Sequence, residues 1–181
     1  MSRLSLIDEA QHPELSSLIT KIKAERGGRF LNLYRTLAHS PGVCEGWLHL
    51  FTELRQKAKL DDLSRELATL EVAVLNGADY EYKAHVPFAL KAGMTQAQLD
   101  ALPGWQVSDL YSAKMRAVLA YTDSMTRQIH VPQAIFAAVR AHFDEREMVE
   151  LTATIGGYNL VSRFLEAMDM PPETGVMKAH D

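Results

Sequence analysis

The segment from Asp62 to Leu75 constrains the fold more than any other part of the chain. Its apolar residues are spaced so that they cover almost the whole circumference of a helix: Leu67, Ala68, Leu70, Val72, Ala73, Val74 and Leu75. A helix that is apolar on all sides is stable only when other elements surround it. The segment therefore predicts a central, buried helix, which the Asn76-Gly77 pair ends.

The rest of the chain is also predicted to be helical. Seven prolines divide it into segments rich in strong helix formers, and no stretch shows the alternation of a strand. Thr95 and Gln98 form a capping-box pattern. We predict an all-α protein with one helical domain over residues 1–170 and a flexible C-terminal tail over residues 171–181. The other expected helices cover approximately residues 13–26, 30–38, 41–58, 79–92, 95–102, 108–129, 132–143 and 144–168.

Composition excludes several classes of function. A length of 181 residues suits one domain with a sizeable core, and a net charge of -4 argues against a nucleic-acid partner. Cys44 is the only cysteine, which excludes a CxxC redox pair and a cysteine-rich zinc site. No apolar run reaches the roughly 18 residues of a membrane span, and the N-terminus lacks a secretory pattern. We expect a cytoplasmic protein with no membrane partner.

Three residues are candidates for catalysis: Glu66, Glu81 and His85. Glu81 and His85 are four residues apart on one expected helix, so their Cβ atoms should lie roughly 5–6 Å apart on one face. A carboxylate beside an imidazole can orient the ring and form an acid/base pair near neutral pH. The alternative is an ordinary solvated helix face, where such pairs are common.

The run from Glu66 to His85 resembles the core of the carboxymuconolactone decarboxylase and alkylhydroperoxidase D (AhpD) family. In that core a Glu opens a buried helix, an Asn-Gly pair ends it, a CxxC opens the next helix, and a His follows one turn later. The spacing matches at Glu66, Asn76-Gly77, Ala84 and His85, and the resemblance covers about residues 62–93. It implies an AhpD-like helical bundle that assembles as a homo-oligomer, a trimer or hexamer.

The chain departs from this family pattern at both cysteine positions, which hold Ala78 and Glu81. The thiol-peroxidase mechanism therefore has no nucleophile. The resemblance then favours the decarboxylase side of the family: cofactor-free acid/base catalysis, by decarboxylation, isomerisation or hydrolysis, of a small organic acid or lactone. His85 would be the general acid/base, Glu66 would orient it or relay its proton, and Glu81 would pair with it or act as a second acid/base.

Alternatives to this hypothesis remain open. One is a peroxidase, a peroxiredoxin-like oxidoreductase that would use Cys44, and another is a non-catalytic oligomer that binds a small ligand. A divalent metal on Glu66, Glu81 and His85 is disfavoured because no HExxH-type signature occurs, so we expect no metal and no cofactor.

Further residues are expected around the candidate site. Asn76, Ala78 and Tyr80 are expected to line its pocket because they lie at or near the family's cysteine positions. Glu71, a charge inside an apolar helix, has two interpretations: a structural partner of an arginine such as Arg163, or a pocket residue.

Overall fold

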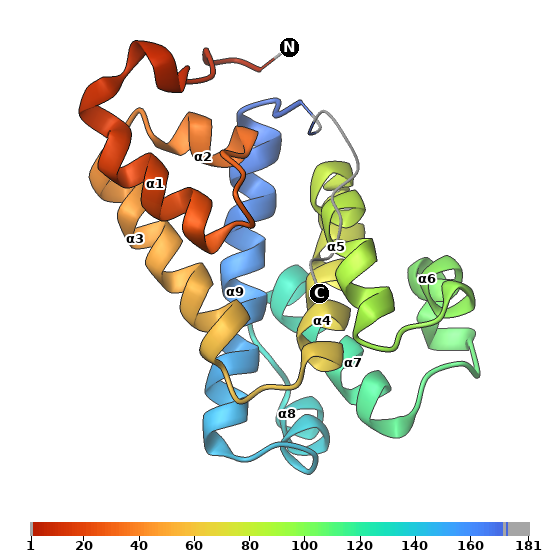
Figure 1. Cartoon of the computed structure of the whole chain (residues 1–181). Coiled ribbons are helices and arrows are strands. Elements are labelled where there is room, and N and C mark those ends of the chain that lie inside the picture. Colours follow the sequence, from red (N-terminus) through yellow and green to blue (C-terminus); the bar gives the residue numbers. More distant parts are fainter. Residues whose placement is uncertain (1, 172, 174–181) are drawn as a thin grey trace. The chain divides into compact units, whose positions relative to one another are not determined.

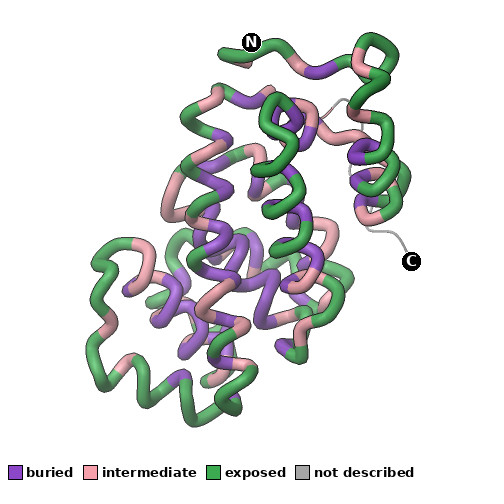
Figure 2. Tube along the Cα trace, turned by 90° about the vertical axis from the view of Figure 1, so that its left-hand side faces the viewer, coloured by how far each residue is buried: buried purple, intermediate pink, exposed green. Residues whose placement is uncertain are grey.

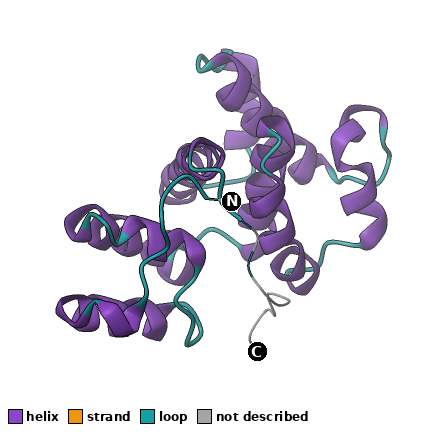
Figure 3. Ribbon diagram, turned by 90° about the horizontal axis from the view of Figure 1, so that it is seen from above, coloured by secondary structure: helices purple, strands orange, loops and turns teal. Residues whose placement is uncertain are grey.

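A computed structural model of the chain describes residues 2–171 and 173 (Figure 1). These residues form helices joined by turns and loops, with no strand among them (Figure 3). The predicted all-α class is confirmed. The helices group into two compact units, whose described residues are 2–57, 164–171 and 173 in one and 58–163 in the other.

The first unit contains two 3₁₀ turns, η1 (Glu9–Gln11) and η2 (Pro13–Leu15), three helices, and a π-helical turn, η3 (Glu53–Lys57). The helices are α1 (Ser16–Glu25), α2 (Asn32–Leu37) and α3 (Pro41–Thr52). Its core includes the fully buried side chains of Ile19, Ile22 and Leu48. The buried Arg26 side chain donates a hydrogen bond of 2.9 Å from Nε to the Tyr34 hydroxyl, which fastens α2 to the end of α1.

The second unit is built around α4 (Asp62–Asn76). Every residue of α4 from Ser64 to Ala73 is buried, so the predicted central helix is confirmed (Figure 2). Helices α5 and α7 both pack on it. The other elements are α5 (Asp79–Lys91), α6 (Gln96–Ala101), the 3₁₀ segment η4 (Leu102–Val107), α7 (Ala113–Gln128), α8 (Gln133–Arg140) and α9 (Glu145–Ala167), which belongs to this unit as far as Arg163.

The turn between α4 and α5 positions the candidate site. Asp61 caps the start of α4, because its Oδ1 accepts a hydrogen bond of 2.9 Å from the Ser64 amide. Gly77 ends the helix in the left-handed conformation, with φ 64° and ψ 28°, which glycine adopts without steric cost. The predicted Asn76-Gly77 break is therefore confirmed. Only Ala78 separates Gly77 from α5, so α5 starts at once and packs against α4.

Some predicted boundaries were wrong. The helix expected from residue 108 begins at Ala113, because the Ser112 hydroxyl accepts a hydrogen bond from the Met115 amide and caps it there. The helix expected from residue 13 begins as a 3₁₀ turn and becomes α-helical at Ser16. The capping box of Thr95 and Gln98 is confirmed.

The predicted flexible tail lies largely outside the described residues. Its two described residues both accept hydrogen bonds from Asn32: the Pro171 carbonyl at 3.3 Å and the Glu173 carboxylate at 2.8 Å. Within the described residues no helix combines the length and the apolar character needed to cross a membrane.

Candidate active site

Glu66 and His85 meet in the interior of the second unit. Oε2 of Glu66 lies 2.7 Å from Nδ1 of His85, and the two residues are only 1% and 7% exposed. A carboxylate can only accept a hydrogen bond, so Nδ1 is the donor when Glu66 is ionised. The hydrogen bond then fixes the tautomer of the neutral ring and leaves Nε2 as the basic nitrogen.

The second carboxylate oxygen of Glu66 bonds to a buried guanidinium. Nε and Nη2 of Arg65 both lie 3.1 Å from Oε1 of Glu66. Nη1 of Arg65 lies 2.7 Å from Asp62, whose side chain is 72% exposed. Glu66 and Arg65 therefore connect His85 to Asp62 at the surface, and the charges of Glu66, Arg65 and Asp62 alternate in sign. A guanidinium on one oxygen and a hydrogen bond from His85 on the other make an ionised Glu66 tolerable inside the protein.

Aromatic rings hold the imidazole of His85 in place. The Tyr158 ring lies edge-to-face with it, with centroids 5.0 Å apart and an interplanar angle of 88°. The Phe88 ring lies 5.9 Å away on the same helix as His85. These rings and the bond to Glu66 fix the orientation of the imidazole, as a general acid/base requires.

Glu81 lies on α5, one turn before His85, but the predicted direct pair between them does not form. Oε2 of Glu81 accepts a hydrogen bond from the Ser162 hydroxyl of α9 instead. Oε1 of Glu81 is buried and has no hydrogen-bond partner among the described residues. Burial raises the pKa of the Glu81 carboxyl to about 8, against the effect of the Ser162 hydrogen bond, which lowers it. The buried environment therefore favours the protonated, neutral form of Glu81 at pH 7.

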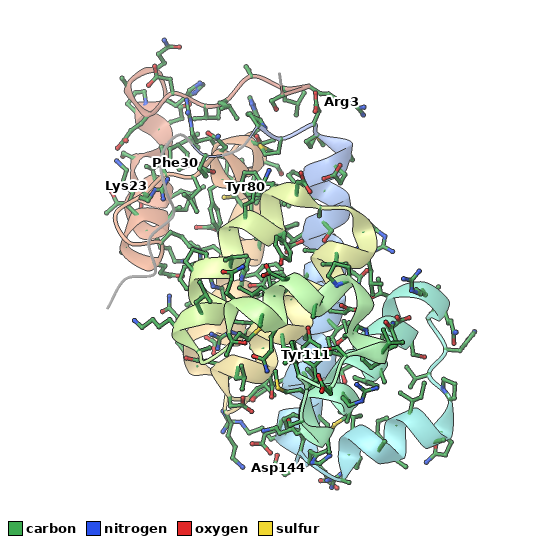
Figure 4. All side chains as sticks on the ribbon, turned by 90° about the vertical axis from the view of Figure 1, so that its right-hand side faces the viewer. Arg3, Lys23, Phe30, Tyr80, Tyr111 and Asp144 are labelled. Atoms are coloured by element: carbon green, nitrogen blue, oxygen red, sulfur yellow. The ribbon has the colours of Figure 1, made fainter. Side chains whose placement is uncertain are left out.

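The three predicted pocket residues have different surroundings. Ala78 lines a cavity of about 340 Å³ between the α4–α5 turn and the segment from α6 to η4. Asn76 donates a hydrogen bond of 3.1 Å to the Asn159 side chain, so it ties α4 to α9. Tyr80 is half-buried on the first turn of α5 (Figure 4). Glu66, Glu81 and His85 are not among the residues that line this cavity, so the role of Asn76, Ala78 and Tyr80 in a pocket at the candidate site stays a prediction.

The donor chemistry of the site suits protons better than a metal. Each oxygen of Glu66 is engaged by a cationic or hydrogen-bonding side chain, and Glu81 is engaged by Ser162. Among residues 2–171 and 173, no three His, Cys, Asp or Glu side chains are grouped so that they could hold a metal ion.

Cys44 has the opposite of the properties that a reactive thiol needs. It is fully buried on α3, and burial raises the pKa of its thiol to about 11, with a smaller contribution from the Glu45 charge. A nucleophilic cysteine needs a lowered pKa, because the thiolate is the reactive form.

Several residues of the site were missed by sequence reasoning. Arg65 is adjacent to Glu66, and its type alone was a usable signal, since a buried carboxylate needs a cation. Ser162 and Tyr158 both come from α9, and Ser162 lies 81 positions after Glu81 in the chain. No local sequence pattern indicates that these two residues belong to the site. Glu71 pairs with the indole of Trp105 rather than with Arg163, whose guanidinium bonds to Asn159.

Comparison with a known structure identifies the fold. The AhpD core structure of an uncharacterised peroxidase-related protein from Ralstonia eutropha JMP134 matches with a TM-score of 0.80. The match covers 97% of this chain and 94% of that one at 21% identity. The predicted AhpD-like fold is therefore confirmed.

Sequence comparison finds two relatives and a family model. Uncharacterised protein YnjA of Escherichia coli (strain K12) is 31% identical over 130 residues, which are 71% of this chain and 68% of YnjA. Uncharacterised protein YdfG of Bacillus subtilis (strain 168) is 29% identical over 115 residues, 62% of this chain and 78% of YdfG. Residues 41–124, which include Glu66, Glu81 and His85, match the family model of carboxymuconolactone decarboxylases. The chain belongs to the carboxymuconolactone decarboxylase family.

Proposed function

We propose that the chain is a cofactor-free acid/base enzyme that acts on a small organic acid or lactone. The observation that carries this proposal is the buried 2.7 Å contact between Glu66 and His85, with Arg65 on the other carboxylate oxygen. An ionised carboxylate behind an imidazole stabilises the imidazolium and keeps the ring oriented for proton transfer. The same arrangement supplies no nucleophilic sulfur, because Ala78 and Glu81 occupy the family's cysteine positions.

Decarboxylation is the reaction that we favour for this site. The bond between the carboxylate carbon and its neighbour breaks, carbon dioxide leaves, and the electron pair stays on the substrate as an enolate. The His85 imidazolium then donates a proton to the enolate carbon, and solvent reprotonates the ring. For an isomerisation, neutral His85 first removes a proton and later returns it to another carbon.

Glu81 is the second acid of the proposed mechanism. As a neutral carboxylic acid it can donate a hydrogen bond to the developing enolate oxygen, which a carboxylate cannot do. Because the pKa of Glu81 is about 8, the acid form is lost above that pH. Turnover should therefore fall as the pH rises through about 8, and Glu81→Gln should remove this limb of the pH profile while it lowers the rate.

The decisive experiment is a turnover assay with a panel of carboxylated lactones and β-keto acids, followed by carbon dioxide release and product NMR. His85→Ala should lower kcat/KM by about 10²–10⁴-fold, the range typical of a lost general acid/base, while the circular dichroism spectrum is retained. His142→Ala, at an exposed histidine of the same unit, is the matched control and should match the wild type. An unchanged rate in the His85 variant removes this residue from the mechanism.

The two alternatives give different results in the same preparation. Peroxidase activity through Cys44 predicts peroxide consumption that Cys44→Ser abolishes, and the raised pKa of that thiol speaks against it. A non-catalytic binder predicts that a panel compound raises the melting temperature by mass action without any product.

We also propose a homo-oligomer, a trimer or hexamer. Exposed apolar side chains on α9 support it, since Val149 and Leu160 are 69% and 50% exposed. Light scattering coupled to gel filtration tests the proposal, and a monomer at micromolar concentration contradicts it.

A further inference from the structure

Glu71 and Trp105 form a second buried polar contact, separate from the one at His85. Glu71 lies in the middle of α4 and is 2% exposed, and Trp105 lies in η4 and is 7% exposed. The indole Nε1–H of Trp105 donates a hydrogen bond of 3.0 Å to Oε1 of Glu71. This bond joins two segments that are 34 positions apart in the chain.

The other carboxyl oxygen of Glu71 has no such support. Oε2 is buried and without a hydrogen-bond partner among the described residues. One neutral donor does not compensate a buried negative charge, so the protonated acid is the form that suits this environment. Burial correspondingly raises the pKa of Glu71 to about 7, although the Trp105 hydrogen bond lowers it.

The charged groups around Glu71 shift its pKa in opposite directions. Asp123 and Arg127 face it from α7, where they form an ion pair of 3.0 Å, and they shift the pKa of Glu71 in opposite directions. Tyr111, from the loop before α7, is buried nearby with its pKa raised to about 12, mainly by burial (Figure 4). Tyr82 of α5 contributes a smaller electrostatic effect that also raises the pKa of Tyr111. The balance leaves Glu71 able to change charge near neutral pH.

The segment that Trp105 holds is also a wall of the 340 Å³ cavity. Pro103 and Leu99 line the cavity from one side, and Ala73 and Val74 of α4 line it from the other. Glu71 precedes Val74 by three residues, so the two lie on one face of α4. The hydrogen bond from Trp105 to Glu71 therefore fastens the two cavity walls together.

The geometry of η4 gives this wall a place to bend. Gly104 departs from helical geometry inside η4, with φ -125° and ψ 30°, directly before Trp105. On the other side of Trp105, the Arg116 guanidinium donates hydrogen bonds to the carbonyls of Trp105, Gln106 and Ser108. The end of η4 is thus anchored to α7 by Arg116. The Trp105 indole holds η4 to α4 through its hydrogen bond to Glu71.

We propose that the Glu71–Trp105 contact is a pH-sensitive clip, which holds η4 against α4 while Glu71 is protonated and loosens when Glu71 ionises. An ionised Glu71 draws water toward Oε2, which separates the indole from α4 and opens the cavity wall at η4. The inference does not depend on the proposed acid/base activity, because neither Glu71 nor Trp105 belongs to the Glu66–His85 site.

Tryptophan fluorescence tests the clip. Trp47→Phe removes the other tryptophan, which packs between Phe51 and Phe164 of the first unit, so that Trp105 alone reports. In this background, acrylamide quenching should rise at least twofold between pH 6 and pH 8, with a midpoint near 7. Adding Glu71→Gln should abolish the rise, whereas Glu81→Gln, at another buried acid, should keep it. The same rise with Glu71→Gln, or a flat profile with Glu71 intact, overturns the proposal.

Two further measurements distinguish the clip from a general loosening. Asp123→Asn should lower the midpoint and Arg127→Gln should raise it, because these charges act on Glu71 in opposite directions. Hydrogen exchange of the unaltered chain, corrected for intrinsic rates, should show at least tenfold weaker protection of residues 102–107 at pH 8 than at pH 6, with residues 148–158 unchanged. Equal protection of residues 102–107 at both pH values contradicts the clip even if the Glu71 variant does not fold.

Discussion

Glu66 and Glu71 lie five residues apart on α4 and are equally buried, yet their surroundings differ in kind. Glu66 has Arg65 on one oxygen and His85 on the other. Glu71 has the indole of Trp105 on one oxygen, and its other oxygen has no partner among the described residues. The same side chain, in the same helix at the same depth, is thus supported as an anion at one position and as a neutral acid at the other.

The difference shows that burial alone does not decide the charge of a carboxyl group in this protein. What decides it is whether a cation or a second donor is buried with it. Glu81 resembles Glu71 in having only a neutral donor. The Ser162 hydroxyl bonds to one oxygen of Glu81, and the other oxygen of Glu81 has no hydrogen-bond partner in the described part of the chain. The candidate site therefore combines one carboxylate that can orient His85 with one carboxylic acid that can donate a proton.

The largest expected effect comes from removing the cation. Arg65→Met leaves the buried Glu66 carboxylate without its guanidinium partner, and breaking a buried ion pair from one side costs about 3–5 kcal/mol. Urea unfolding at pH 7 measures this loss. Lys83→Met is the matched control, because its pair with Asp79 is exposed, and its cost should be below about 1 kcal/mol. Equal losses in the two variants would show that Glu66 does not need its cation.

Glu71 should produce the next largest effect, and this effect should depend on pH. A carboxyl group whose pKa is raised on folding stabilises the native state below its unfolded pKa of 4.5, and this stabilisation is lost as the pH rises through about 7. One pKa unit corresponds to about 1.4 kcal/mol. The free energy of unfolding of Glu71→Gln, relative to that of the wild type, should therefore increase by about 2–3 kcal/mol between pH 5 and pH 8.

The comparison is made between two urea series, one for the wild type and one for the variant. Glu81 titrates in both proteins, so its contribution cancels in the difference. A difference that stays constant from pH 5 to pH 8 would mean that Glu71 does not change its charge in this range.

The sequence predicted the positions of these groups better than their partners. The all-round apolar pattern of α4 and the Asn76-Gly77 break are local features, so they correctly predicted a buried helix and its end. The family resemblance grouped Glu66 and His85 in one site, but the sequence did not show whether their side chains meet. The structure places them 2.7 Å apart. Trp105 and Ser162 reach their carboxyl groups from η4 and α9, and only the packing of the unit brings them there.

The same limit explains the wrong expectations. Glu81 and His85 are correctly spaced for a pair on one helix face, but spacing says nothing about Ser162, which takes the Glu81 carboxyl instead. For Glu71 the sequence left two interpretations open, an arginine partner such as Arg163 or a place in the pocket. The structure pairs it with the Trp105 indole rather than with Arg163, and no local sequence pattern indicates that contact.

Trp105→Phe should have a smaller effect than Glu71→Gln and the opposite sign. It removes the one donor of Glu71 and leaves a buried acceptor unsatisfied, which costs about 1–3 kcal/mol. Because the proposed clip is closed at pH 5.5 and open at pH 8, the loss should be greater at pH 5.5 than at pH 8. A loss that does not change with pH would mean that the indole contributes through packing alone.

Asp62→Asn should have the smallest effect. It tests whether the charge of Glu66 is stabilised by its buried contacts alone or also by the exposed Asp62. Asp62 contacts Arg65 at 2.7 Å, but its side chain is 72% exposed, and solvent screens such a pair to about 1 kcal/mol or less. The buried contacts of Glu66 with Arg65 and His85 stay intact in this variant, so urea unfolding and turnover should both remain close to the wild type. A loss comparable to that of Arg65→Met would mean that Asp62 holds the guanidinium in place, and that the charge of Glu66 depends on a residue at the surface.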